Sequence, residues 1–272
     1  MFNSLIFTKN RASQLRLLLE SIKKNADGIF NINVLYKHTT DEFKKGYDKL
    51  REENILPNIT WIEETSFKEQ VVKFLDSDYE FSLFFTDDDI IYNPIKNKEE
   101  ISKAFEDDDL LTFSLRLGLN TKFCYMLNCD NVLIPLEQKE KAIIWDWTKH
   151  FSDSAYPLSV DGHIFKTEDI KNFSKNINYN NPNSYEGALQ IFDNFPKYKM
   201  AAFLNSCLVN TPINMVQNVF ENNRQGDKYG IKPEELNTKY LNDEIIDFEK
   251  LDFSNIIGCH QEIPFIFKNN KS

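Results

Sequence analysis

Glycine is scarce in this chain, which has only 8 glycines among 272 residues. Neither a G-x-G-x-x-G run nor a G-x-x-x-x-G-K-S/T run occurs, so a nucleotide ligand would not be held by one of these glycine-rich phosphate loops. Long apolar runs are also absent, since no stretch reaches the roughly 18 residues that a membrane-spanning helix needs. The first residues lack the charged-then-apolar layout of a signal peptide, and these absences together favour a cytoplasmic protein.

Cysteine and basic residues are limited as well. The 4 Cys show neither a C-x-x-C pair nor regular spacing, which is typical of reduced, structural thiols. Lys and Arg number 32 against 42 Asp and Glu, which gives a net charge of -10. Because a dedicated binder of nucleic acid or of anionic membranes usually has a basic face, this balance argues against both classes. A net charge of this sign is still compatible with a local basic pocket that binds phosphate.

What the chain does have is the composition of a globular protein, with 41% hydrophobic and 14% aromatic residues. Its first half alternates short apolar segments typical of strands with segments whose apolar residues recur at helical spacing. The expected strands are 4–8, 32–36, 59–62, 81–85 and 110–115, and the expected helices are 13–25, 41–53, 67–75 and 99–105. This alternation predicts an α/β fold with a mostly parallel central sheet flanked by helices.

The second half is less regular. We expect a hairpin over 156–165 that turns at Asp161-Gly162, because Asp-Gly is a common hairpin turn. Further on we expect a helix over about 185–195, a strand over 201–209, a helix over about 234–241 and an extended tail over 256–267. No repeat, linker or clear boundary divides the chain, so residues 1–272 are expected to form a single domain with a C-terminal extension.

The strongest chemical signal is the run Thr86-Asp87-Asp88-Asp89, directly after the strand 81–85. Three adjacent carboxylates between apolar flanks repel one another, and Mg²⁺ or Mn²⁺ resolves that conflict because it prefers oxygen ligands. The run also follows a strand, and ligands of open α/β sheets bind beyond the carboxyl ends of strands. A second run, Asp107-Asp108-Asp109, precedes a strand, so we expect it at the opposite edge as a solvated loop.

These features resemble the GT-A glycosyltransferases, which use nucleoside-diphosphate sugars and carry a D-x-D motif after the fourth strand of an α/β series. The opening segment Leu5-Ile6-Phe7-Thr8-Lys9-Asn10-Arg11 resembles the first strand and nucleotide-contacting loop of family-2-type enzymes, often written P-T-x-N-R. Phe7 stands where that pattern has proline. The resemblance covers roughly residues 3–195. It implies a nucleotide-binding half up to about residue 120 and an acceptor-side half from about 121.

The resemblance also implies roles for particular residues. Asp87 and Asp89 would be the D-x-D carboxylates and ligands of Mn²⁺ or Mg²⁺, with Asp89 the first candidate for a direct ligand. Asp87 or Asp88 would contact the ribose or the donor sugar. The remaining candidates for the nucleotide pocket are Thr8, Lys9, Asn10 and Arg11, for which a plain surface loop is the alternative.

Three further residues are weaker candidates. Arg116 follows the strand 110–115, where its guanidinium could clamp a phosphate or pair with the nearby acids. Glu186 is either a general base for the acceptor hydroxyl, as the resemblance implies, or the N3 residue of a helix capped by Asn183. His260 is a candidate third metal ligand by the same resemblance, although a lone His is often structural.

The function expected from this resemblance is metal-dependent transfer of a sugar from a nucleoside-diphosphate donor, commonly a UDP-sugar, to a hydroxyl acceptor such as a glycan. If Glu186 is a base, the reaction inverts the anomeric centre. One alternative is a non-catalytic protein of the same fold that binds nucleotide sugars. Another is a sugar-1-phosphate nucleotidyltransferase, which is disfavoured because the first loop has no glycine.

Overall fold

The computed structural model describes residues 1–191, 196–217 and 223–270. Its centre is a nine-stranded sheet in the order β3-β2-β1-β4-β11-β6-β12-β10-β9. The strands are β1 (Phe2–Lys9), β2 (Phe30–Lys37), β3 (Thr60–Glu63), β4 (Phe81–Thr86), β6 (Leu110–Ser114), β9 (Glu137–Gln138), β10 (Ala142–Asp146), β11 (His163–Lys166) and β12 (Lys199–Phe203). Neighbouring strands from β3 to β4 are parallel, as are β6 and β12, whereas β11 runs antiparallel between β4 and β6.

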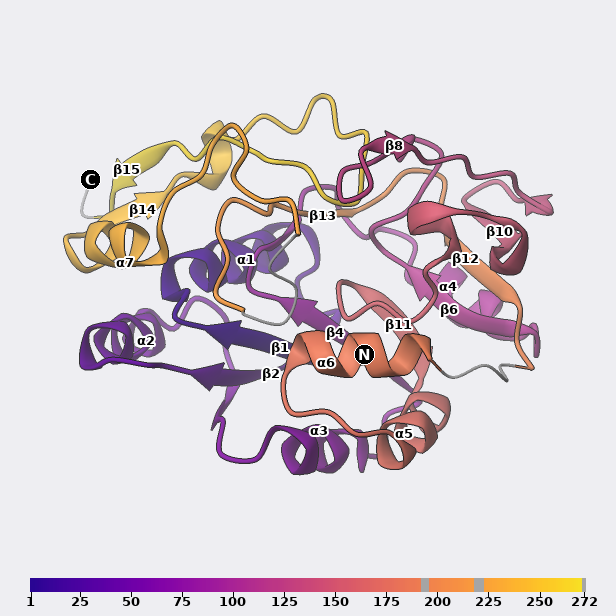
Figure 1. Ribbon diagram of the computed structural model, residues 1–272, viewed down its shortest axis with the longest axis horizontal. Coiled ribbons are helices and arrows are strands. Elements are labelled where there is room, and N and C mark those ends of the chain that lie inside the picture. Colours follow the sequence, from indigo (N-terminus) through magenta and orange to yellow (C-terminus); the bar gives the residue numbers. More distant parts are fainter. Residues whose placement is uncertain (192–195, 218–222, 271–272) are drawn as a thin grey trace.

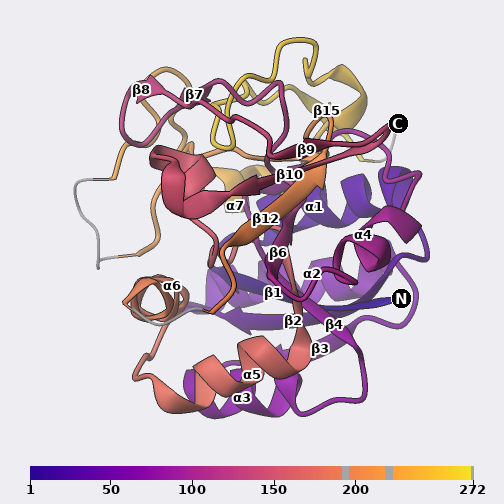
Figure 2. The ribbon, with the colours of Figure 1, turned by 90° about the vertical axis from the view of Figure 1, so that its right-hand side faces the viewer.

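Helices cover both faces of this sheet (Figures 1 and 2). Along β1, Leu5 and Phe7 pack against α3 and α6 on one face, and Ile6 packs against α1, α2 and α4 on the other. This is the two-residue alternation of a strand buried on both sides. The helices are α1 (Ala12–Asn25), α2 (Asp41–Glu53), α3 (Phe67–Leu75), α4 (Glu99–Ala104), α5 (Thr167–Asn176), α6 (Pro182–Gln190) and α7 (Pro233–Leu241).

Smaller elements pack around the sheet. Three two-stranded ladders pair β5 (Asp89–Ile91) with β13 (Leu208–Asn210), β7 (Phe123–Cys124) with β8 (Cys129–Asp130), and β14 (Glu244–Ile246) with β15 (Phe267–Asn269). Short 3₁₀ turns are η1 (Trp147–Lys149), η2 (Ser152–Ala155) and η3 (Phe248–Lys250). Among the residues that the structure describes, no helix is long and apolar enough to cross a bilayer.

The predictions for the first half are confirmed. Every expected strand and helix up to residue 115 is present, with ends that differ by one or two residues. The expected α/β class and mostly parallel sheet are confirmed as well.

The second half corrects several predictions. The hairpin over 156–165 is wrong, because only β11 forms there and its partners are β4 and β6. The expected strand 201–209 is two strands, β12 and β13, that end in different ladders. The tail 256–267 contains only a single bridge, at His260, before β15 begins at Phe267. The strand β10 and the helix α5 were not predicted.

The helix expected over 185–195 is also displaced. It begins at Pro182, and residues 192–195 of the expectation lie outside the described residues. Its N-cap is Asn181, whose side chain accepts from the Ser184 N–H, while the Ser184 hydroxyl accepts from the Asn181 N–H. The capping box is therefore Asn181 with Ser184, and the expected pair Asn183 with Glu186 is wrong.

The strand directions place the two acidic runs at opposite edges of the sheet. Asp87 follows β4, on the edge where β1 and β2 also end. Asp109 precedes β6, which runs parallel to β4 because both pair antiparallel with β11. This arrangement confirms the expected separation and directs attention to the carboxyl-end edge.

Candidate active site

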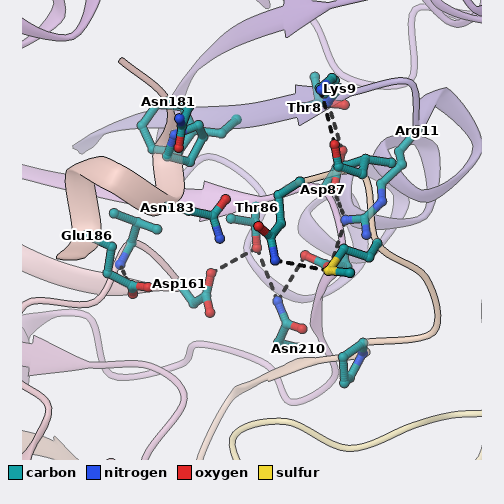
Figure 3. Close-up of a pocket in the computed structure, with 18 of the residues that line it drawn as sticks. Thr8, Lys9, Arg11, Thr86, Asp87, Asp161, Asn181, Asn183, Glu186 and Asn210 are labelled. Carbon is teal, nitrogen blue, oxygen red and sulfur yellow. Dashed lines mark hydrogen bonds and ion pairs between the residues drawn. The ribbon is translucent and has the colours of Figure 1, made fainter. Parts of the chain in front are cut away.

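A cavity of about 430 Å³ lies at that edge (Figure 3). Its walls come from the loops after β1 and β4, the start of α6 and the segments near residues 210–217 and 223–225. The sequence-predicted residues that line it are Thr8, Lys9, Arg11, Asp87, Asp88, Glu186 and His260. The remaining three, Asn10, Asp89 and Arg116, do not line it.

Arg11 joins the loop after β1 to the acidic run. Its Nη1 lies 2.9 Å from Asp87 Oδ1 and 2.9 Å from Asp88 Oδ2, and its Nη2 donates to the Asn214 carbonyl. Asp87 is 3% exposed and also accepts from the Lys9 N–H. Burial raises the pKa of Asp87 to about 6, even though the Arg11 charge opposes this shift. The pair fixes the relative position of two loops that meet only in the folded chain.

Asn10 shapes the same loop without facing the cavity. It adopts a positive φ of 61°, a conformation that Asn tolerates better than most residues. Its side chain accepts from the Thr39 N–H and donates to the Thr39 hydroxyl, so it ties the loop after β1 to the loop after β2. Asn10 therefore holds this loop in place, and its side chain does not line the cavity.

Asp89 is fully buried at the start of β5 and turns away from the cavity. Its Oδ2 accepts from the Thr86 N–H at 2.9 Å, and its Oδ1 lies 3.2 Å from Asn210 Nδ2. The same Asn210 nitrogen lies 3.0 Å from Asp88 Oδ1, so one amide donates to both carboxylates. Burial and the nearby Asp161 and Asp88 raise the pKa of Asp89 well above its ordinary value. Asp88 is thus the more accessible of the two carboxylates.

Asp161 is a site residue that the sequence reasoning missed. The Thr86 hydroxyl donates to its Oδ1 at 2.9 Å, and Arg116 Nη1 and His260 Nε2 lie 3.2 and 3.4 Å from its Oδ2. Burial alone would raise the pKa of Asp161, but the His260 contact and the Arg116 charge lower it to about 2. The dipeptide Asp161-Gly162 was visible in the sequence, where it was interpreted as a hairpin turn. Asn210 was not among the residues that the sequence predicted for the site either.

Arg116 and His260 both contact the Oδ2 atom of Asp161. Arg116 is 2% exposed and also donates to His163 Nε2, so it supports the cavity floor and does not reach the cavity itself. Of the two expectations for Arg116, the geometry favours the ion pair. The Nδ1 atom of His260 is buried and has no hydrogen-bond partner among the described residues.

Glu186 lies on the first turns of α6, opposite the acidic run. Its Oε1 accepts from the Ser159 hydroxyl at 2.8 Å and from the Val160 N–H at 3.0 Å. Removal from bulk water and the nearby Asp161 raise the pKa of Glu186, while Arg116 opposes the shift. Glu186 therefore does not cap α6. Its hydrogen bonds to Ser159 and Val160 hold the carboxylate at the cavity wall.

The chemistry of these side chains fits a hard divalent cation. Asp88 and Asp161 supply carboxylate oxygens at the cavity, and the Nδ1 of His260 is a buried polar atom without a partner in the described ranges. Within those ranges, no three His, Cys, Asp or Glu side chains converge to hold a metal by themselves. Asp88, Asp161 and His260 therefore fit a cation that takes one or two carboxylates from the protein and its other oxygen ligands from phosphate and water, as Mg²⁺ commonly does.

Comparison with known proteins adds a relative. No protein-family model matches the chain. The bifunctional glycosyltransferase pgtA of Dictyostelium discoideum is 26% identical over 251 residues, which cover 79% of this chain and 32% of that protein. The chain thus spans about a third of the length of its curated relative. This similarity confirms the resemblance to glycosyltransferases that the sequence motifs predicted.

Two solved structures are similar in outline. Residues 1–349 of S. aureus TarS match with 21% identity and a TM-score of 0.45, over 76% of this chain and 59% of that chain. Mycobacterium tuberculosis glucosyl-3-phosphoglycerate synthase, in complex with Mg²⁺ and UDP, matches with 13% identity and a TM-score of 0.41, over 74% and 68%. Because both TM-scores are below 0.5, we assign no residue of this chain from either structure.

Proposed function

We propose that this chain is a glycosyltransferase that moves a sugar from a nucleoside-diphosphate donor to a hydroxyl acceptor, with a UDP-sugar as the first donor to test and a glycan as acceptor. The observation that carries the proposal is the acidic run 87–89, of which Asp87 and Asp88 line a cavity on the carboxyl-end edge of the sheet. The volume of about 430 Å³ is within the range of small-molecule sites. The sequence relative is itself named a glycosyltransferase.

In this proposal the donor lies between the loops after β1 and β4. Thr8, Lys9 and Arg11 line the nucleotide side, and Asp87 or Asp88 contacts the ribose or the donor sugar. Residues up to about 120 form the nucleotide-binding half and those from about 121 the acceptor-side half of one domain, 1–272. Asn10 and Arg116 act on the donor through the residues that they hold.

We assign the divalent cation, Mn²⁺ or Mg²⁺, to Asp88 and Asp161, with His260 and Asp89 as further ligands if their side chains rotate on binding. A bound cation would neutralise charge that develops on the leaving diphosphate. The chain's own residues prepare for it, because Arg11 and Asn210 hold the carboxylates in place before any ligand arrives. His260 and Arg116 keep Asp161 ionised.

Glu186 is the candidate general base. Its position beside Asp161 and its raised pKa suit a carboxylate that accepts a proton from an acceptor hydroxyl. The Ser159 and Val160 hydrogen bonds orient the Oε1 atom of this carboxylate at the cavity wall. Direct attack assisted by such a base inverts the anomeric centre.

Thermal unfolding with a panel of nucleoside diphosphates tests the donor site. A ligand at 100 times its Kd stabilises by about 2.7 kcal/mol, which for a chain of this size raises Tm by several degrees. We expect a shift with one nucleotide that requires Mn²⁺ or Mg²⁺ and is lost in Asp88→Asn. Absence of a shift with every nucleotide in folded protein would contradict the proposal.

Release of free nucleoside diphosphate from the donor then tests turnover. We expect slow release from one donor in the presence of the cation and faster release when an acceptor is added. Nucleotide binding without any release would instead support the non-catalytic binding protein.

A further inference from the structure

The wall of the cavity that carries Glu186 also carries a carboxamide, that of Asn183 on α6. Two further carboxamides, Asn223 and Gln225, line the cavity from the segment that follows residue 222. No hydrogen bond of these three side chains occurs within the part of the chain that the structure describes. A carboxamide both donates and accepts, as a sugar hydroxyl does, so unpaired amides suit a ligand rich in hydroxyl groups.

The basic side chains at the cavity already have partners. Within the described residues, the Lys and Arg side chains that line it are Lys9, Arg11, Lys37 and Arg224. Arg11 pairs with Asp87 and Asp88, and Lys37 pairs with Glu64. Lys9 donates to the Val216 carbonyl at 3.1 Å. Each of these four side chains therefore has at least one hydrogen-bond or ion-pair partner within the described residues.

Arg224 lies between Asn223 and Gln225 in the chain, and its guanidinium has several partners. Its Nη2 lies 2.7 Å from Asp227 Oδ2, and its Nη1 donates to the Tyr125 carbonyl and to Asn128 Oδ1. The guanidinium also stacks 4.4 Å from the centre of the Tyr125 ring. Arg224 therefore holds the segment with Asn223 and Gln225 in place, and its charge is balanced by Asp227.

The start of α6 offers little to an anion as well. Helix N-termini attract anions through free N–H groups, but Pro182 has no N–H and Asn181 caps that of Ser184. Glu186, one turn further, adds a carboxylate to this wall. An acceptor with a phosphate or carboxylate here would meet the Glu186 carboxylate, while every Lys and Arg that lines the cavity in the described ranges already has a partner.

We propose that the part of the cavity beside Asn183 and Glu186 binds the acceptor, that this acceptor is an uncharged, hydroxyl-rich group such as a neutral sugar, and that Asn183 recognises one of its hydroxyls. This inference rests on the glycosyltransferase function proposed above. Asn183 and Glu186 are three residues apart on α6 and share one face of the helix. In Figure 3 the Asn183 side chain extends from α6 towards the centre of the cavity.

The chemistry of transfer gives the two side chains separate tasks. The acceptor oxygen forms a bond to the anomeric carbon while the bond from that carbon to the diphosphate oxygen breaks. The diphosphate leaves with the bonding electrons, and the proton of the acceptor hydroxyl passes to Glu186. Asn183 binds a neighbouring hydroxyl, which fixes the reacting oxygen beside Glu186.

The test compares matched acceptors by direct binding and by transfer. The probes are p-nitrophenyl glycosides of glucose, galactose, mannose and N-acetylglucosamine, set against p-nitrophenyl glucuronide and glucose 6-phosphate. Binding is measured by calorimetry, on the protein alone and with UDP and Mn²⁺. We expect at least one neutral glycoside to bind and the anionic probes to bind at least tenfold more weakly.

Variants at Asn183 assign the recognition. One hydrogen bond accounts for about 3- to 10-fold in affinity, so Asn183→Ala should weaken binding of the neutral glycoside by that factor. Asn183→Gln, which keeps the carboxamide, should restore part of the affinity. Asn172→Ala removes a matched, exposed amide on α5 and should have no effect.

Equal or tighter binding of the anionic probes, binding of no neutral probe, or an unaltered affinity in Asn183→Ala would overturn the inference. The two proposals fail in different ways. If neutral glycosides bind in an Asn183-dependent manner but no nucleotide shifts Tm, the proposed glycosyltransferase function is contradicted, while the proposed sugar-binding site at Asn183 is supported.

Discussion

The chain contains two runs of three aspartates, and they differ in almost every physical respect. Asp87–Asp89 follow β4 at the carboxyl-end edge, where the run is tied to Arg11 and Asn210 at a cavity. Asp107–Asp109 precede β6 at the other edge. There Lys199 pairs with Asp107 at 2.8 Å and with Asp109 at 3.2 Å, and Asp108 is exposed.

The difference teaches that the composition of an acidic run says little about its chemistry. Carboxylates in water are stable without help, whereas buried ones need cations, hydrogen bonds or a bound metal. The direction of the preceding or following strand decides which of these environments a run meets. Changes at the first run should therefore cost more than similar changes at the second run or at other exposed positions.

The largest expected effect is on stability when the buried cation is removed. Arg11→Met leaves Asp87 and Asp88 without their ion pair, and breaking a buried pair from one side costs about 3–5 kcal/mol. Lys199→Met removes the cation of the second run, where surface pairs contribute at most about 1 kcal/mol. Urea unfolding measures both. A loss below about 1 kcal/mol in Arg11→Met would show that the two runs are equally solvated.

The next effect is on activity. Asp88→Asn keeps the shape of the side chain but removes a charge at the cavity, so we expect kcat/KM for transfer to fall about 100-fold or more. Asp108→Asn makes the same change in the exposed run and should leave kcat/KM unaltered. Steady-state kinetics with varied Mn²⁺ checks both variants. Equal activity of the two variants would remove the first run from the active site.

A smaller effect is expected from the hydroxyl that links the first run to Asp161. Thr86→Val removes the donor to Asp161 Oδ1 and the acceptor of the Asn210 amide, and we expect a loss of about 1–2 kcal/mol. Thr148→Val removes a similar bond to Asp146 from an exposed residue, where a change within about 0.5 kcal/mol is usual. Denaturation midpoints of both variants provide the comparison.

Much of the first half could be predicted because its signals are local. Helical spacing within α1, α2 and α3 and the apolar run of β4 lie inside single segments, and parallel strands then fix which loops share an edge. That was enough to bring Lys9, Arg11 and Asp87 together. Even the opposite placement of Asp107 followed from its position before a strand.

The rest depends on pairings between residues far apart in the chain. Asp161 reaches the site because β11 inserts antiparallel between β4 and β6, and no local pattern distinguishes that strand from half of a hairpin. Asn210 arrives through the ladder of β13 with β5. The cap of α6 was misplaced by two residues, since Asn181 and Asn183 are chemically alike and Pro182 was not used to choose between them.

The smallest effect is on the pH dependence of stability at the second run. Partial burial opposes the shift, but the Lys199 hydrogen bond, the Asp109 N–H and the Lys199 charge lower the pKa of Asp107 below its ordinary value of 3.8. A carboxylate with a lowered pKa stabilises the fold above its unfolded-state pKa and loses this contribution as the pH falls through the folded-state pKa. We therefore expect Asp107→Asn to lower the free energy of unfolding by less than about 1 kcal/mol at pH 7, and the difference from wild type to vanish towards pH 3. Urea unfolding of both proteins between pH 7 and pH 3 measures the difference. A difference that persists at the lowest pH would show that Asp107 contributes through shape and not through charge, and the second run would then be more like the first than its exposure suggests.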